Sequence, residues 1–165
     1  MIATIFFIVP AILEVELWYL IDSPDLPSLQ SVFIGNRSFG YSDTFDITNS
    51  KSLTTIEIGD HCFSNVNEFK LSNIVNLKQL RIGTNSFTKE INNFGINKRR
   101  SFSITSCHNL ESIVIGEYSF SDYSGRFTLE DLPSLESVKI GVVEIGSWNF
   151  YFSSFIIKSI IAWNL

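Results

Sequence analysis

Two kinds of short stretch, each alternating apolar and polar residues, recur along the chain. The first kind is Phe-x-Ile or Phe-x-Leu, as in FDI, FKL, FSI and FTL. The second kind is followed by a glycine, as in VFI, IEI, LRI, IVI and VKI. Alternation with a period of two places both apolar side chains on the same face of a β-strand. The pattern therefore predicts two short strands per repeating unit, each with one buried face.

The glycines that follow the second stretch set the period. The steps between them are 24, 24, 33 and 25 residues, and the leucines that open the same stretches take the same steps. The two series are Gly35, Gly59, Gly83, Gly116 and Gly141, and Leu29, Leu53, Leu77, Leu110 and Leu135. A period in the twenties indicates a solenoid. We interpret each glycine as the end of a strand, where the chain bends because glycine tolerates backbone angles that other residues avoid.

The predicted fold is a β-rich solenoid, a stack of parallel-strand coils with about 24 residues per repeat. Residues 26–149 are expected to form this solenoid as one domain of the 165-residue chain. Residues 1–25 are interpreted as an apolar N-terminal cap, a degenerate repeat or a signal segment. The absence of Lys and Arg before the apolar run disfavours the signal. Residues 150–165 are interpreted as a degenerate repeat or C-terminal cap, in which Ile157 takes the place of Leu135.

The repeating unit resembles the leucine-rich repeat family. LKQLRIGTNSF fits the short form L-x-x-L-x-L-x-x-N-x-L with Asn85 in the Asn place, where other copies carry Arg37, His61 and Tyr118. The IGxxSF element, and VVEIGSWNF at residues 142–150, look like the I-G-x-x-A-F element of BspA-like leucine-rich repeats. The resemblance covers residues 26–141. It implies parallel strands on a curved array that binds other macromolecules, often in secreted or cell-surface proteins of bacteria and protists.

Composition and motifs narrow the function classes. The net charge of −5 and the pI of about 5.0 argue against nucleic acid as a partner. The two cysteines give no disulfide framework and are interpreted as small buried side chains. No phosphate-binding, nucleophile-elbow or zinc-protease motif occurs, and His61 and His108 fall on different parts of the repeat. We therefore expect no enzyme and no cofactor. The compartment stays open, with secretion or the cell surface as options, and the apolar termini leave membrane association open.

One candidate binding surface is the column of outward positions in the second stretch. Its members are Phe33, Glu57, Arg81, Val114 and Lys139. Glu57 and Arg81 are expected to form a salt bridge between coils. Phe33, Arg81 and Val114 are the candidate contacts for a partner. The alternative is an ordinary solvated face, on which single apolar residues are common.

The other candidate surface is an insertion in the third repeat. Phe87 and Phe102 lie 15 residues apart, where sister repeats have six or seven, so about nine extra residues form a loop near residues 88–100. Its candidate contacts are Phe94, Lys98, Arg99 and Arg100. The alternative is a tolerated insertion, since lengthening a surface loop costs little free energy.

These observations favour a non-enzymatic scaffold that mediates protein–protein interaction through its exposed strand face or its inserted loop. The alternative is a structural or adhesive spacer segment of a longer cell-surface repeat protein. A polysaccharide-cleaving enzyme on a parallel β-solenoid would need several convergent acidic or basic residues along one groove, and the sequence shows no such set.

Overall fold

The computed structural model describes residues 3–7, 28–89, 99–144 and 146–158. Within these ranges the chain forms β-strands, turns and no helix. The strands are β1 (Ala3–Phe7), β2 (Leu29–Ile34), β3 (Thr44–Thr48), β4 (Thr55–Ile58), β5 (Glu68–Ser72), β6 (Gln79–Ile82), β7 (Ser101–Thr105), β8 (Ser112–Ile115), β9 (Arg126–Glu130), β10 (Ser137–Ile140) and β11 (Ser154–Lys158).

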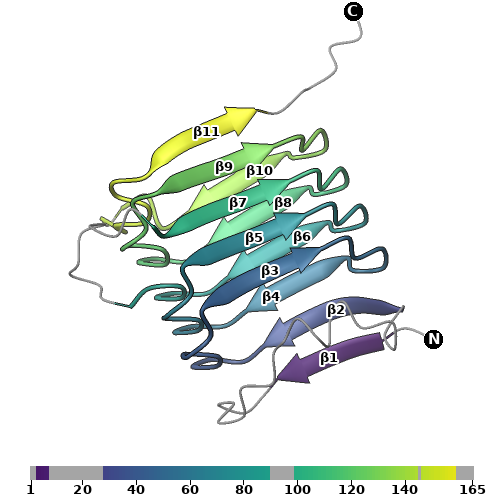
Figure 1. Ribbon diagram of the computed structural model, residues 1–165, viewed down its shortest axis with the longest axis horizontal. Helices are drawn as coiled ribbons and strands as arrows, with labels where there is room; N and C mark the ends of the chain where they lie inside the picture. Colours follow the sequence, from purple (N-terminus) through teal and green to yellow (C-terminus); the bar gives the residue numbers. More distant parts are fainter. Residues whose placement is uncertain (1–2, 8–27, 90–98, 145, 159–165) are drawn as a thin grey trace, which may run out of the picture.

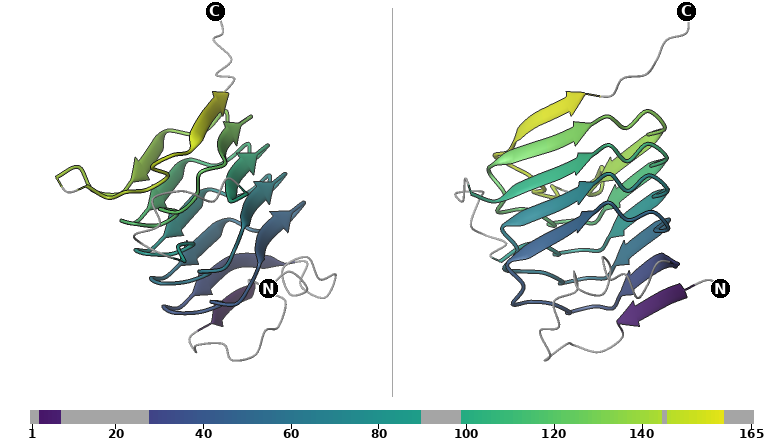
Figure 2. Two further views of the ribbon diagram at one scale, coloured as in Figure 1. Left: turned by 60° about the vertical axis from the view of Figure 1, so that its left-hand side comes forward. Right: turned by 45° about the vertical axis from the view of Figure 1, so that its right-hand side comes forward.

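The strands form two parallel sheets that face each other (Figures 1 and 2). Sheet A has the order β1-β2-β4-β6-β8-β10, and sheet B has the order β11-β9-β7-β5-β3. Each turn of the chain adds one strand to each sheet. We number the coils 1 to 5 by their strand pairs β2/β3, β4/β5, β6/β7, β8/β9 and β10/β11. The predicted β-solenoid of stacked parallel-strand coils, with two strands per unit, is confirmed.

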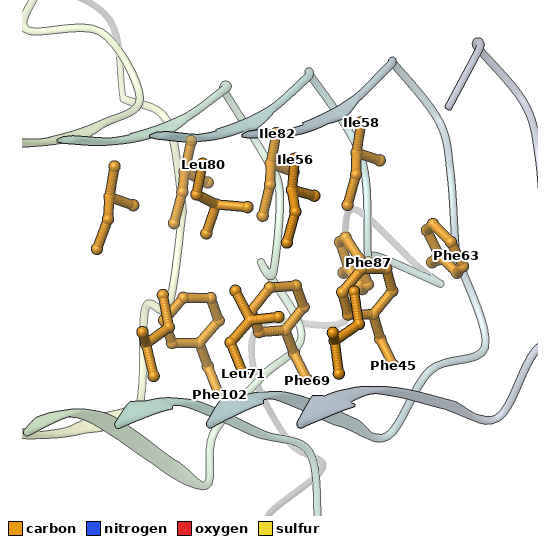
Figure 3. Packing of buried hydrophobic residues seen from close by; sticks show 14 of the residues in the cluster. Phe45, Ile56, Ile58, Phe63, Phe69, Leu71, Leu80, Ile82, Phe87 and Phe102 are labelled. Carbon is orange, nitrogen blue, oxygen red and sulfur yellow. The ribbon is translucent and has the colours of Figure 1, made fainter. Parts of the chain in front are cut away.

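The core lies between the two sheets and is organised as columns of like residues (Figure 3). Phe45, Phe69, Phe102 and Phe127 stack with ring centroids 4.7–4.8 Å apart. A second column consists of Phe39, Phe63, Phe87, Phe120 and Phe150, with centroids 4.7–5.2 Å apart. Edge-to-face contacts, such as the 5.1 Å contact of Phe69 with Phe87, join the columns. Because parallel strands lie about 4.8 Å apart, one Phe per coil gives continuous stacking.

The repeating glycines are not required for the backbone angles of the bend, contrary to what the sequence suggested. Among the described glycines only Gly141 has a positive φ, of 66°. A Cβ on Gly116 would instead lie 2.6 Å from the carbonyl oxygen of Gly83 in the coil below. These glycines are thus needed where two backbones approach closely. The bend itself is made by left-handed residues two and four places later, such as His61 and Phe63, with φ of 57° and 56°.

The last coil departs from the sequence prediction in two ways. In coil 4 the carbonyl of Glu117 accepts a hydrogen bond from the N–H of Asn85 in coil 3. In coil 5 the carbonyl of Ser147 accepts the equivalent hydrogen bond from the N–H of Tyr118, so Ser147 occupies the position of Glu117. Residues 142–146 are therefore a second, five-residue insertion after Gly141. In addition, Ile157 pairs with Leu129 of β9, so it does not take the place of Leu135. β11 continues sheet B, and β1 continues sheet A beyond β2.

Candidate functional site

The predicted outward positions of sheet A form one aligned column. Phe33, Glu57, Arg81, Val114 and Lys139 are successive register partners across β2, β4, β6, β8 and β10. Glu57, Arg81 and Lys139 are exposed, and Phe33 and Val114 are half-buried. We call these five residues the outer column. The stacking of neighbouring coils brings together side chains that lie 24–33 residues apart in the sequence.

The charges of the outer column do not neutralise each other. Glu57 and Arg81 are register partners, yet no ion pair joins them in the part of the chain that the structure describes, so the predicted salt bridge is wrong. Three residues before Arg81 and Val114, Lys78 and Glu111 approach to 4.0 Å on adjacent coils. An exposed pair of this kind contributes about 0–1 kcal/mol. The outer column thus presents an acid and a base that stand side by side without a mutual ion pair.

The outward side chains of sheet B are matched with one another. Lys70 and Asp46 form an ion pair of 2.9 Å between coils 1 and 2. The hydroxyls of Ser72 and Thr105 are hydrogen-bonded at 3.0 Å between coils 2 and 3. This face satisfies its own polar groups to a greater extent than the outer column does, which makes it a natural reference surface.

The inserted loop divides into residues inside and outside the described ranges. Phe94 and Lys98 lie outside them, and Arg99 is exposed and has interactions of its own. Arg100 is only 2% exposed, so its assignment as a partner-binding residue is wrong. A charged side chain at the end of a loop suggests a surface position. Arg100 lies in the interior instead, because hydrogen-bond acceptors surround its guanidinium there.

Arg100 is held by two neighbouring coils. Its Nη1 donates to a carboxylate oxygen of Asp122 in coil 4, while its Nε donates to the carbonyl of Val66 at 3.0 Å and its Nη2 to the carbonyl of Ser64. The guanidinium also lies over the ring of Tyr123, 5.0 Å from its centroid. These two carbonyls of coil 2 face the point where coil 3 departs from the 24-residue pattern. The guanidinium supplies donors to both.

Asp122 connects both ends of the insertion to coil 4. Its Oδ2 accepts from Arg100 at one end and from the backbone N–H of Lys89, at 3.3 Å, at the other. Burial raises the pKa of the Asp122 carboxyl, and the nearby Arg100 opposes that rise. The Tyr123 hydroxyl donates to the Val66 carbonyl at 2.7 Å, and burial raises the pKa of this phenol. Sequence reasoning missed Asp122 and Tyr123, although both lie shortly after Phe120, at the point of coil 4 that matches the start of the insertion after Phe87 in coil 3.

The two cysteines are structural. Both are fully buried, burial raises the pKa of Cys62, and it raises that of Cys107 to about 11. Cys62 Sγ donates to the Gly35 carbonyl at 3.1 Å, as Ser86 and Ser119 donate from the same position of their coils to Gly59 and Gly83. A high pKa and full burial keep a thiol unreactive.

Further chemistry is sparse in the described ranges. His108 and Asp131 form an exposed pair at 2.9 Å, and the hydrogen bond from His108 lowers the pKa of Asp131. Within these ranges no three His, Cys, Asp or Glu side chains gather where they could ligate a metal. The same residues include no helix of sufficient length and apolarity to cross a membrane.

Comparison with known proteins adds no relative. No protein-family model, curated protein or solved structure matches this chain.

Proposed function

We propose that this chain is a non-enzymatic scaffold that binds another protein through the outer column of sheet A, with the inserted loop as a second contact. The resemblance of its IGxxSF element to that of BspA-like leucine-rich repeat proteins supports this proposal. The observation that carries the proposal is the outer column itself. Half-buried Phe33 and Val114 stand there on either side of exposed Glu57 and Arg81, in register on adjacent strands.

The sheet makes the outer column a rigid surface. At about 4.8 Å per strand, five positions extend over about 19 Å. The backbones of Phe33, Glu57, Arg81 and Val114 are fixed by strand pairing on both sides, so little conformational entropy is lost there when a partner binds. Apolar groups supply contact area, and the acid and base beside them favour a partner of complementary charge pattern.

Site-specific photo-cross-linking tests which face is used. A photoreactive residue at position 81 reports on the outer column, and one at position 103 reports on the outer face of sheet B. We expect a protein adduct from position 81 and none from position 103. An adduct from position 103 alone would place binding on the opposite face.

Charge reversal then measures the contribution of the outer column to affinity. The Glu57→Lys/Arg81→Glu variant reverses two neighbouring charges and leaves the net charge unchanged. We expect its affinity for the cross-linked protein to fall at least about tenfold, which corresponds to about 1.4 kcal/mol. The matched control is Asp46→Lys/Lys70→Asp, which reverses the ion pair on sheet B. Equal affinities for both variants and the wild type, measured by calorimetry, would contradict the proposal.

A deletion tests the inserted loop separately. Removing residues 90–98 restores the 24-residue step between Phe69 and Phe102 and leaves Lys89, Arg100 and Asp122 in place. Binding that survives this deletion but not the charge reversal assigns the contact to the outer column alone. Binding lost only on deletion assigns it to the loop.

A second candidate function is a structural or adhesive spacer. The matched outer face of sheet B favours it, because the Lys70–Asp46 ion pair and the Ser72–Thr105 hydrogen bond satisfy polar groups within the chain. A spacer predicts no adduct from either cross-linking position.

A further inference from the structure

The first and last coils differ in the exposure of their inward-facing side chains. In coil 1 the inward-facing Val32, Phe45 and Ile47 are at most 1% exposed. In coil 5 the corresponding positions are open to solvent, with Val138 at 41%, Phe155 at 52% and Ile157 at 65%. Their register partners in coil 4, which are Ile113, Phe127 and Leu129, are at most 3% exposed. The apolar columns of the core therefore end in a solvent-exposed layer.

The backbone is open at the same end. Among the described strands, β10 is the last of sheet A and β11 is the last of sheet B. An edge strand presents unpaired N–H and C=O groups that can pair with another strand. Coil 5 thus offers two strand edges with apolar side chains between them, at the upper end of the stack in Figure 1.

Further apolar residues surround this layer. Of the nine exposed large hydrophobic residues in the described ranges, eight lie between positions 138 and 157, and Tyr41 is the other. Trp148 contacts Tyr151 at 5.0 Å, and Tyr151 contacts Phe152 at 4.6 Å, so these three rings form one cluster. Such a concentration is unlike the scattered single apolar residues of an ordinary surface.

The exposed area approaches what a stable dimer needs. Trp148, Tyr151, Phe152 and Phe155 are 42–55% exposed. At about 150–250 Å² per aromatic side chain, these four present on the order of 300–500 Å² of largely apolar area. Val138, Val142, Val143 and Ile157 add to it. A standard interface buries about 800 Å² per partner, so this patch supplies roughly half of it before any polar rim is counted.

We propose that the coil 5 end is a self-association surface on which a second copy of this chain docks through its own coil 5 end. A two-fold axis sets edge strands of the two copies antiparallel, which lets their backbone groups pair and closes the assembly as a dimer. Glu136 and Lys139 are both exposed on this coil, so the surface carries both signs of charge and can face its own copy. The inward-facing side chains of coil 1 are buried, which disfavours head-to-tail stacking on that coil.

This dimer and the proposed binding role share only Lys139. Phe33, Glu57, Arg81 and Val114 of the outer column belong to coils 1–4, and the self-association surface belongs to coil 5. One can fail while the other holds.

Light scattering after size-exclusion chromatography tests the dimer on the full chain. We expect a mass of about twice the monomer mass of 18.7 kDa at micromolar concentration, with dissociation on dilution. The Ile157→Asp variant places a charge in the exposed layer, where two copies would bring like charges together, and should raise the dimer dissociation constant at least tenfold. The matched control, Tyr41→Asp, changes a residue that is 77% exposed outside this surface and should leave the dimer intact.

Several outcomes would overturn the proposal. A wild-type chain that stays monomeric up to 100 µM would show that a second copy does not cover the layer. Open-ended assemblies would show head-to-tail stacking. A dimer that is equally stable in Ile157→Asp would place the contact elsewhere, provided circular dichroism shows an unchanged fold.

Discussion

Replacing Gly116 by alanine is expected to lower the free energy of unfolding by about 3 kcal/mol. The new Cβ would lie 2.6 Å from the Gly83 carbonyl oxygen and 2.7 Å from the Thr84 nitrogen. Both are backbone atoms of coil 3, so relief requires the two coils to move apart. Overpacking in a close-packed interior costs about 1–3 kcal/mol, and a clash with backbone belongs at the upper end of that range. Urea denaturation followed by circular dichroism measures the loss.

The matched control for this substitution is Gly40→Ala. A Cβ there would meet only Ser64 Oγ, at the ordinary contact distance of 3.7 Å, and Gly40 has no positive φ. We expect no loss, and a gain of about 0.4–1 kcal/mol because alanine restricts the unfolded chain. If Gly116→Ala were as stable as Gly40→Ala, the close approach of coils 3 and 4 at this position would be refuted.

Replacing Asp122 by alanine is expected to cost about 3–5 kcal/mol, because it leaves the buried guanidinium of Arg100 without its counter-charge. The two side chains are 2% and 4% exposed, so water cannot replace the lost partner without local opening. The same substitution removes the acceptor for the Lys89 N–H. Hydrogen exchange should therefore speed up at residues 89 and 99–101, beside the global loss measured in urea.

Two further variants separate charge burial from general damage. Asp46→Ala removes one partner of the half-exposed Lys70–Asp46 pair and should cost less than about 1 kcal/mol. Arg100→Met/Asp122→Leu removes both buried charges and should recover much of the stability lost in Asp122→Ala. A double variant no more stable than the single one would show that the hydrogen bonds of Arg100 to Ser64 and Val66 matter more than its charge.

The fold was predictable because the core is periodic. Each coil places a Phe, such as Phe69 or Phe102, at the same point of its sheet B strand. It also places an apolar pair, such as Ile56 and Ile58, on its sheet A strand. The alternation of apolar and polar residues predicted the strands, and the repeat of about 24 residues predicted the stack of coils. The role of the glycines was not predictable, because the distance between two backbones is a property of the assembled coils.

The candidate site was predictable only in part. The outer column follows directly from strand register, so its alignment could be read from the spacing of Glu57 and Arg81. The burial of Arg100 could not, because it depends on Asp122, which is 22 residues away and reaches it through the stacking of coils 3 and 4. The open end escaped prediction as well. Ile157 looks like a core residue by its pattern, and it is exposed because nothing in the described chain stacks on coil 5.

Stacked coils bring positions that are distant in sequence together as the outer column. A designed disulfide between Arg81→Cys and Val114→Cys, with Cys62→Ser and Cys107→Ile to remove the native thiols, tests this stacking. These positions are register partners across the 33-residue step, and adjacent parallel strands lie about 4.8 Å apart, within reach of a disulfide. We expect rapid intramolecular oxidation of this pair and none for Arg81→Cys/Ser103→Cys, which is closer in sequence but spans opposite outer faces. Oxidation of the second pair at the same rate as the first, or of neither, would refute the stacking of these coils.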